Sequence, residues 1–178
     1  MGAELVVFNR MTPGCDIMPF HKIARAVNRK IDIMYEYTDG TSQFDEIIDP
    51  LPFDINAPVV KIEDGDYALW YRDLSEDPKK YDGKVVEYKG LAAVNPRMKP
   101  GMFFFGRQLM TCCVEDIQFA GLLTLCDADK MPENGKWYTM RLSVAYKWHK
   151  LYGRKGPVLT LQNIEPAEAP AQPVATFY

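Results

Sequence analysis

The 178-residue sequence lacks the motifs that would assign a reaction directly. It contains no Gly-rich phosphate-binding loop, no HExxH zinc motif and no GxSxG nucleophile turn. Histidine occurs only at His21 and His149, and we expect each to lie at the surface or to cap an element. These absences argue against the common hydrolase and nucleotide-binding enzymes. We therefore lean towards a protein that is not an enzyme.

Long hydrophobic runs are also missing. The longest, such as Met102 to Phe105, are far too short to cross a bilayer. The N-terminus has only the short apolar stretch Leu5 to Phe8 and lacks the basic start and apolar core of a signal peptide. We expect a soluble chain that is cytoplasmic by default, and membrane-associated or extracytoplasmic if an upstream segment has been removed.

Cysteine is scarce, and charge of one sign does not dominate. The four cysteines at positions 15, 112, 113 and 126 are too few and too irregularly spaced for a disulfide scaffold, and they form no CxxC pair. The net charge of −3 argues against sequence-independent binding of nucleic acid through its phosphates. Apolar residues make up 47% of the chain, which is typical of a globular protein.

The first part of the chain, residues 1–64, mixes strand and helix patterns. Pro19 can occupy the first turn of a helix, and Phe20, Ile23, Ala24 and Val27 then follow with the spacing of one helical face. Alternation over residues 31–37 predicts a strand that follows this helix. We interpret residues 1–64 as a smaller mixed α and β region.

A second helix and a set of strands follow in residues 65–164. Tyr67, Trp70, Tyr71 and Leu74 repeat with helical spacing, and we expect them to pack in the core. Period-two patterns then predict strands at about 84–94, 102–111, 117–126, 136–148 and 157–164. Short connections favour antiparallel neighbours, so we predict an α+β protein with a C-terminal five-stranded antiparallel OB-like β-barrel. Residues 165–178 form a Pro/Ala-rich tail.

Cys112 and Cys113 are the pair of residues that suggests a chemical site. Adjacent side chains of a strand point to opposite faces, but the following residues Val114 to Asp116 predict a corner, where this constraint is lifted. There both thiolates and the Asp116 carboxylate can converge on a soft or borderline metal such as Zn²⁺. A fourth ligand could come from Cys15 or Cys126.

Two other interpretations of the cysteine pair stay open. The two sulfurs can form a redox pair that closes a strained vicinal disulfide, with Arg107 nearby to hold the thiolates. Alternatively, one cysteine is buried as a small hydrophobe and the other has no role.

A basic segment near the C-terminus offers a different kind of site. Lys147, Lys150, Arg154 and Lys155 interleave with the aromatic residues Trp148 and Tyr152. On an OB-like barrel, the loop that joins the last two strands often contacts nucleic acid, and bases stack on aromatic rings. The alternative is a solvated hairpin tip with one buried tryptophan, and the acidic chain as a whole favours that alternative.

Several of these segments resemble the YcgQ-like proteins, an uncharacterised bacterial family. Residues 74–90 look like the start of that family's C-terminal domain. Residues 105–116, with Thr111, Cys112 and Cys113, are similar to its Arg…Thr-Cys-Cys…Asp segment, and Gly121 matches the glycine that follows. The Pro-rich ending, residues 166–178, also fits, so that the resemblance covers residues 65–178.

The resemblance implies a partner rather than an activity. Family members commonly carry N-terminal membrane spans and accompany a predicted permease, whereas this chain has residues 1–64 in place of the spans. The leading hypothesis is a non-enzymatic binding or accessory protein, metal-binding through Cys112, Cys113 and Asp116 and linked to a permease. The alternatives are an OB-type single-stranded nucleic-acid-binding protein and a thiol redox protein.

Overall fold

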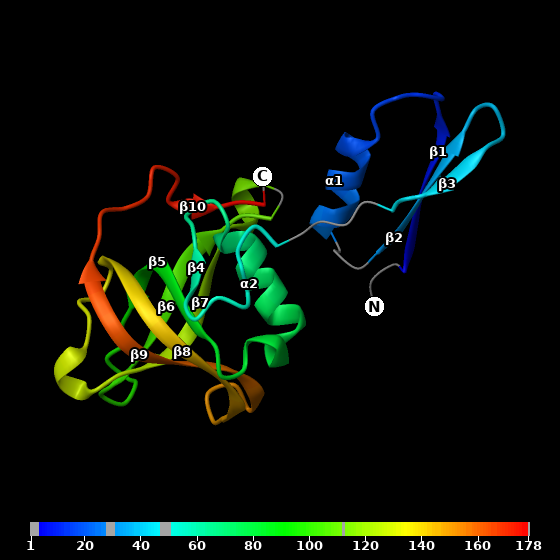
Figure 1. Ribbon diagram of the computed structural model, residues 1–178. Coiled ribbons are helices and arrows are strands. Elements are labelled where there is room, and N and C mark those ends of the chain that lie inside the picture. Colours follow the sequence, from blue (N-terminus) through cyan, green and yellow to red (C-terminus); the bar gives the residue numbers. More distant parts are fainter. Residues whose placement is uncertain (1–3, 28–30, 47–50, 112, 178) are drawn as a thin grey trace. The chain divides into compact units, whose positions relative to one another are not determined.

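The computed structural model describes residues 4–27, 31–46, 51–111 and 113–177 of the chain. These residues belong to two compact units, Met1–Pro50 and Leu51–Tyr178 (Figure 1). Each unit has a hydrophobic core of its own. Within the described residues, no helix is long and apolar enough to cross a membrane.

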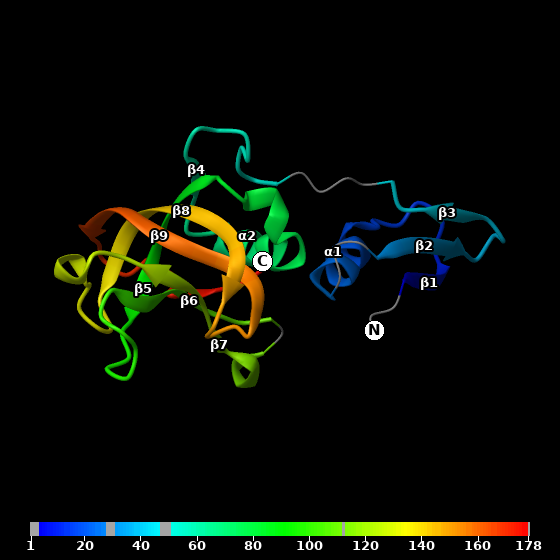
Figure 2. The same ribbon diagram turned by 90° about the horizontal axis from the view of Figure 1, so that it is seen from below.

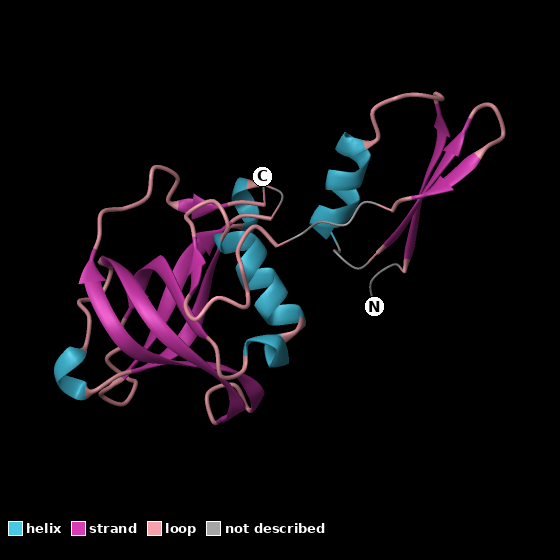
Figure 3. Ribbon diagram, in the orientation of Figure 1, coloured by secondary structure: helices cyan, strands magenta, loops and turns pink. Residues whose placement is uncertain are grey.

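The first unit is a three-stranded sheet with a helix on one face (Figure 3). Its elements are β1 (Leu5–Met11), α1 (Met18–Val27), β2 (Asp32–Tyr37) and β3 (Ser42–Phe44). β1 pairs with β2 in parallel, and β2 pairs with β3 antiparallel. Phe8 and Tyr35 are neighbours across the parallel pair, and both face the core beneath α1.

The buried face of α1 differs from the predicted one. Ile23 is 62% exposed, whereas Ala24 is buried and Phe20 packs against the core. His21, expected at the surface, is only 1% exposed. The reason is that Ile17, Phe20, His21 and Ala24 also repeat with the period of one helical face, so the helix is rotated towards a stripe that includes a histidine. The Val27 side chain lies outside the described part.

The second unit is built on a seven-stranded sheet. Its strands are β4 (Val60–Ile62), β5 (Val85–Ala93), β6 (Met102–Leu109), β7 (Gln118–Leu125), β8 (Trp137–His149), β9 (Arg154–Pro166) and β10 (Val174–Ala175). The helices are α2 (Tyr67–Glu76) and the short 3₁₀ turns η1 (Pro78–Tyr81), η2 (Val114–Asp116) and η3 (Ala128–Lys130). The described residues therefore form mostly β-sheet with two α-helices, an α+β fold. The five strands expected from alternation are all present in the second unit.

Five strands of this sheet close into a ring. β5 pairs with both β6 and β8, so the order β5-β6-β7-β9-β8 returns to β5 (Figure 2). β4 and β10 are added at the sides by parallel pairing with β5 and β6. The ring is not purely antiparallel as predicted, because β7 and β9 run parallel. These two strands are not consecutive, so the short connections that enforce antiparallel pairing elsewhere do not constrain them.

The core of the second unit lies between α2 and the ring. Tyr67, Trp70 and Leu74 are at most 1% exposed, which confirms that the aromatic stripe packs in the core. Tyr67 donates a hydrogen bond of 2.5 Å to the Ala120 carbonyl oxygen, in a part of the ring where Gly106 lets the backbones approach closely. A Cβ at Gly106 would lie 2.1 Å from that same oxygen, so only glycine fits there.

The β8–β9 hairpin extends beyond the end of its neighbouring strand β5. β5 pairs with β8 only as far as Ser143, whereas β8 and β9 stay paired to His149 and Arg154. The end of this hairpin therefore has fewer neighbouring strands than its base. The tip is the part of the ring where large side chains can stay exposed.

Candidate functional site

The tip of the β8–β9 hairpin carries the basic and aromatic residues that the sequence singled out. Trp148 is 61% exposed and pairs across the hairpin with Lys155. Lys147, Lys150 and Arg154 are exposed as well. The tip is solvated, as the alternative interpretation predicts, but the buried tryptophan of that interpretation is wrong. Trp148 continues the alternation that buries Met140, Leu142 and Val144, but it lies past the end of the ring, where no described strand covers it.

Tyr152 has a different place from the other five tip residues. Its hydroxyl donates a 2.8 Å hydrogen bond to the Pro157 carbonyl oxygen and accepts one of 3.0 Å from the Leu123 backbone N–H. Its ring lies close to Gly156, where an added Cβ would come within 2.9 Å of a ring carbon. Burial raises the pKa of Tyr152, so that its phenol stays neutral near neutral pH. Tyr152 therefore fastens the tip to β7.

Two clefts adjoin the hairpin tip. One, of about 350 Å³, lies between the β5–β6 loop and the tip and is lined by Arg97, Met98, Lys99, Met102, His149, Lys150 and Leu151. The other, of about 390 Å³, lies among α2, η1, β7, β8 and β9. Neither lining includes an aspartate or a glutamate, although the chain as a whole carries a net charge of −3. The charged side chains that line both clefts are therefore lysines and arginines.

The cysteine corner is only partly described, because Cys112 lies outside the described residues. Cys113 is exposed and lies immediately before η2, in the connection from β6 to β7. It donates a hydrogen bond to the Glu115 carboxylate, and this bond holds the pKa of Glu115 below its ordinary value. Asp116 accepts a hydrogen bond of 2.9 Å from the Thr111 backbone N–H.

The corner does not contain a complete metal-binding group within the described residues. In this part of the chain, no three histidine, cysteine, aspartate or glutamate side chains are grouped so that they could hold a metal ion. Cys126 is half-buried, with its Sγ 3.5 Å from the Met131 sulfur, and burial raises the pKa of its thiol. The predicted set of Cys112, Cys113 and Asp116 stays a prediction, since one member is not described.

Arg107 is bound by backbone carbonyl oxygens. Its side chain is 1% exposed and donates hydrogen bonds of 2.7 Å to the Asp64 carbonyl oxygen and 2.5 Å to the Gln172 carbonyl oxygen. It therefore joins the segment before α2 to the C-terminal segment, a structural role that explains why a charged side chain is buried in β6.

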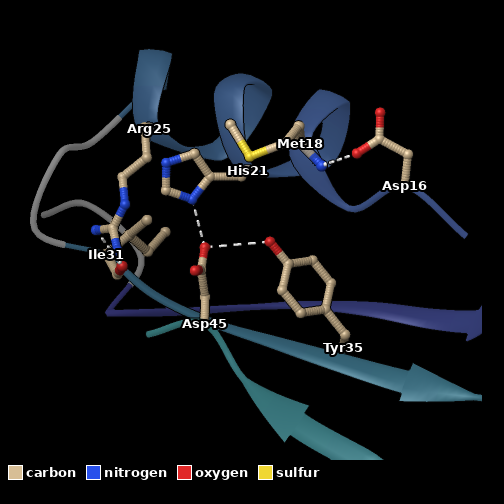
Figure 4. Close-up of polar contacts among 7 residues, drawn as sticks. All are labelled: Asp16, Met18, His21, Arg25, Ile31, Tyr35 and Asp45. Carbon is tan, nitrogen blue, oxygen red and sulfur yellow. Dashed lines mark hydrogen bonds and ion pairs between the residues drawn. The ribbon is translucent and has the colours of Figure 1, made fainter. Parts of the chain in front are cut away.

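The first unit holds a buried polar group that the sequence did not reveal. The Nδ1 of His21 and the Oδ2 of Asp45 lie 2.5 Å apart, and the Tyr35 hydroxyl donates to the same oxygen over 3.1 Å (Figure 4). The two paired side chains are 1% and 0% exposed. A carboxylate can only accept, so the His21 Nδ1 carries the shared hydrogen. Burial and Asp45 together raise the pKa of Tyr35 above its ordinary value.

Only a weak signal in the sequence could have found this group. His21 lies in the same helical repeat as Ile17, Phe20 and Ala24, which places it on the buried face if the stripe is started at Ile17. Asp45, however, lies 24 residues further along the chain, just beyond the short strand β3. No local sequence pattern therefore predicts that the two residues are in contact.

Comparisons with known proteins add a family but no activity. No curated protein matches the chain. The family model described as the DUF1980 C-terminal domain, a domain of unknown function, matches residues 39–175. This range includes the whole five-stranded ring, the cysteine corner and the hairpin tip. Since the match extends over more than half of the sequence, the chain belongs to the family of DUF1980 C-terminal domains.

Proposed function

We propose that this chain is a non-enzymatic binding protein whose second unit is an OB-like β-barrel with its ligand site at the β8–β9 tip. The ring supports the barrel interpretation through its order. β8, β5, β6 and β7 lie side by side as strands four, one, two and three of a Greek key, and β9 closes the ring. A five-stranded Greek-key barrel of this kind uses the loops after its first and fourth strands to hold ligands.

The single observation that carries the proposal is the exposure of Trp148 among cations. The Trp148 side chain is 61% exposed, so a large apolar ring is in contact with water. This contact is unfavourable, and a partner that covers the ring would remove it. Lys155 is its cross-strand neighbour, and Lys147 precedes it. Stacking on an aromatic ring beside positive charge is the way in which proteins hold single-stranded nucleic acid. We therefore take a single-stranded nucleic acid as the ligand.

The test is a titration of fluorescently labelled single-stranded oligonucleotides at several salt concentrations. The full chain should bind more weakly as salt increases, and Trp148→Ala should weaken binding by a roughly tenfold factor or more, because one base loses its stacking partner. Lys147→Ala with Lys150→Ala should reduce the salt slope by about one unit per lysine. Lys61→Ala with Lys79→Ala, two exposed lysines of other elements, is the matched control. No binding at low salt would refute the proposal.

The second candidate function is metal binding at the cysteine corner. Its support is that Cys113 is an exposed thiol with Glu115 and Asp116 within the same turn and Cys112 immediately before it. Thiolates and carboxylates suit Zn²⁺, which would make the corner a binding site of an accessory protein. The purified reduced chain should then bind about one Zn²⁺, and Cys112→Ser with Cys113→Ser should abolish it. Metal analysis that finds no difference between the two proteins would contradict this function.

Two further proposals rest on less. The family resemblance suggests a permease as partner, which co-purification of the chain with a co-expressed candidate permease would test. A thiol redox function of Cys112 and Cys113 would require that one thiol has a pKa below that of an ordinary cysteine. Labelling with a thiol reagent at a series of pH values would test this.

A further inference from the structure

The ring has an open seam between β7 and β9. Their ladder consists of two residue pairs, Thr124 with Leu159 and Leu125 with Thr160. Before these pairs the two strands separate, and the Tyr152 hydroxyl spans the gap by bonding to Leu123 on one side and Pro157 on the other. The cleft of about 390 Å³ lies at this seam, and its size is within the range of small-molecule sites.

The walls of the seam cleft combine aromatic rings with positive charge. Tyr71 of α2, Tyr146 of β8 and Tyr152 contribute the rings. Arg154 and Lys155 contribute two cations. Gly121 and Gly156 also line the cleft, and aromatic rings pack directly on their backbone, since an added Cβ would come within 2.3 Å of the Phe119 ring and 2.9 Å of the Tyr152 ring.

The charges of the cleft favour an anion. No carboxylate is among its lining residues, although aspartate and glutamate outnumber lysine and arginine in the chain, 24 to 21. Burial raises the pKa values of Tyr71 and Tyr152, so neither phenol adds a negative charge near neutral pH. Arg154 and Lys155 therefore have no anionic partner within the lining of the cleft and are available to a negatively charged group.

We propose that the seam cleft binds one nucleotide, with the base among the tyrosine rings and the phosphate at Arg154 and Lys155. The rings provide flat apolar surface for a planar base, and the two cations lie at the tip end of the same cleft, where a phosphate stays accessible to water. This inference rests on the proposed function for the source of the nucleotide, a bound strand. It adds a defined subsite beside the Trp148 surface.

Three small molecules distinguish binding of the base from binding of the phosphate. Binding of AMP, adenosine and ribose 5-phosphate to the full chain is followed by amide NMR at Gly121 and Gly156. AMP should bind more tightly than either of the other two and should shift both glycine amides. Arg154→Ala with Lys155→Ala should weaken AMP binding roughly tenfold and leave adenosine binding unchanged. Tyr71→Leu should weaken AMP and adenosine but not ribose 5-phosphate.

The controls separate this subsite from the proposed function. Lys147→Ala with Lys150→Ala lies outside the seam cleft and should leave AMP binding unchanged. Thermal unfolding followed by tryptophan fluorescence confirms that each variant is folded. Absence of shifts at both glycines up to about 1 mM AMP would overturn the subsite, as would equal affinity for AMP and ribose 5-phosphate. Oligonucleotide binding that persists in that case leaves the proposed function intact, whereas AMP binding without oligonucleotide binding refutes the proposed function alone.

Discussion

Removal of His21 should unfold the first unit while the second unit stays folded. In His21→Ala, the Asp45 carboxylate loses the imidazole 2.5 Å away but stays in a site where its side chain is 0% exposed. Removal of one member of a buried ion pair typically costs about 3–5 kcal/mol. The Tyr35 hydroxyl still donates to the carboxylate, and such a bond offsets only about 1 kcal/mol.

This loss is comparable with the whole stability of so small a unit. At about 0.05–0.15 kcal/mol per residue, the unit Met1–Pro50 has roughly 2.5–7.5 kcal/mol in total. A large fraction of the His21→Ala molecules should therefore have an unfolded first unit at 25 °C. Ile23→Ala, at an exposed position on the same helix, should cost at most about 0.5 kcal/mol and is the matched control.

The two units can be monitored separately. All three tryptophans, Trp70, Trp137 and Trp148, belong to the second unit, so that fluorescence during urea unfolding reports that unit. Amide NMR spectra report both units. In His21→Ala the signals of residues 5–46 should collapse to unfolded positions while the fluorescence transition keeps its midpoint. Dispersed, unshifted signals from the first unit would refute the argument that the buried pair stabilises it.

Other predictions follow from single contacts. Gly106→Ala should destabilise the second unit by about 3 kcal/mol, measured by urea unfolding, because its Cβ would meet the Ala120 carbonyl oxygen at 2.1 Å; an unchanged midpoint would contradict the close approach. Tyr152→Phe should cost about 1–3 kcal/mol, because the Leu123 N–H and the Pro157 carbonyl lose their partner, and fluorescence-detected unfolding measures it. Burial raises the pKa values of Tyr67 and Tyr88 above the ordinary value of 10.0, so both phenols should stay neutral in the folded chain at pH 11 and ionise only on unfolding. Because a raised folded pKa favours the protonated state, the contribution of these two tyrosines to the stability of the second unit should be constant below pH 10 and decrease above it. Absorbance at alkaline pH, measured beside unfolding curves, checks this, and ionisation of all tyrosines together in the folded chain would contradict it.

The strands of the second unit could be predicted because one residue in two faces a buried interior. Met140, Leu142 and Val144 show this alternation, and the predicted strand ends differ from the observed ones by a few residues at most. The parallel pairing of β7 with β9 could not be predicted, because it joins strands that are not consecutive and depends on closing the ring. The same limit applies to β10, which has two residues and pairs in parallel with β6, a strand far from it in the sequence.

For the candidate sites too, contacts between residues near in the sequence could be predicted, and contacts between distant residues could not. The hairpin tip could be predicted because its basic and aromatic residues are close together in the sequence and the hairpin keeps them together. The role of Tyr152 could not, since its partner Leu123 lies 29 residues away and becomes a neighbour only through the ring. His21 and Asp45 were missed for the same reason, because their contact depends on how α1 lies on its sheet.

The most direct test of the proposed binding site is the response of the Trp148 fluorescence to a single-stranded oligonucleotide. A variant in which Trp70 and Trp137 are replaced by phenylalanine isolates this signal, provided that its amide spectrum stays dispersed. Stacking of a base should quench the fluorescence in a saturable manner, and added salt should reverse the quenching. Fluorescence that stays constant while the oligonucleotide binds would show that the strand contacts another surface, and constant fluorescence without binding would contradict the proposed function altogether.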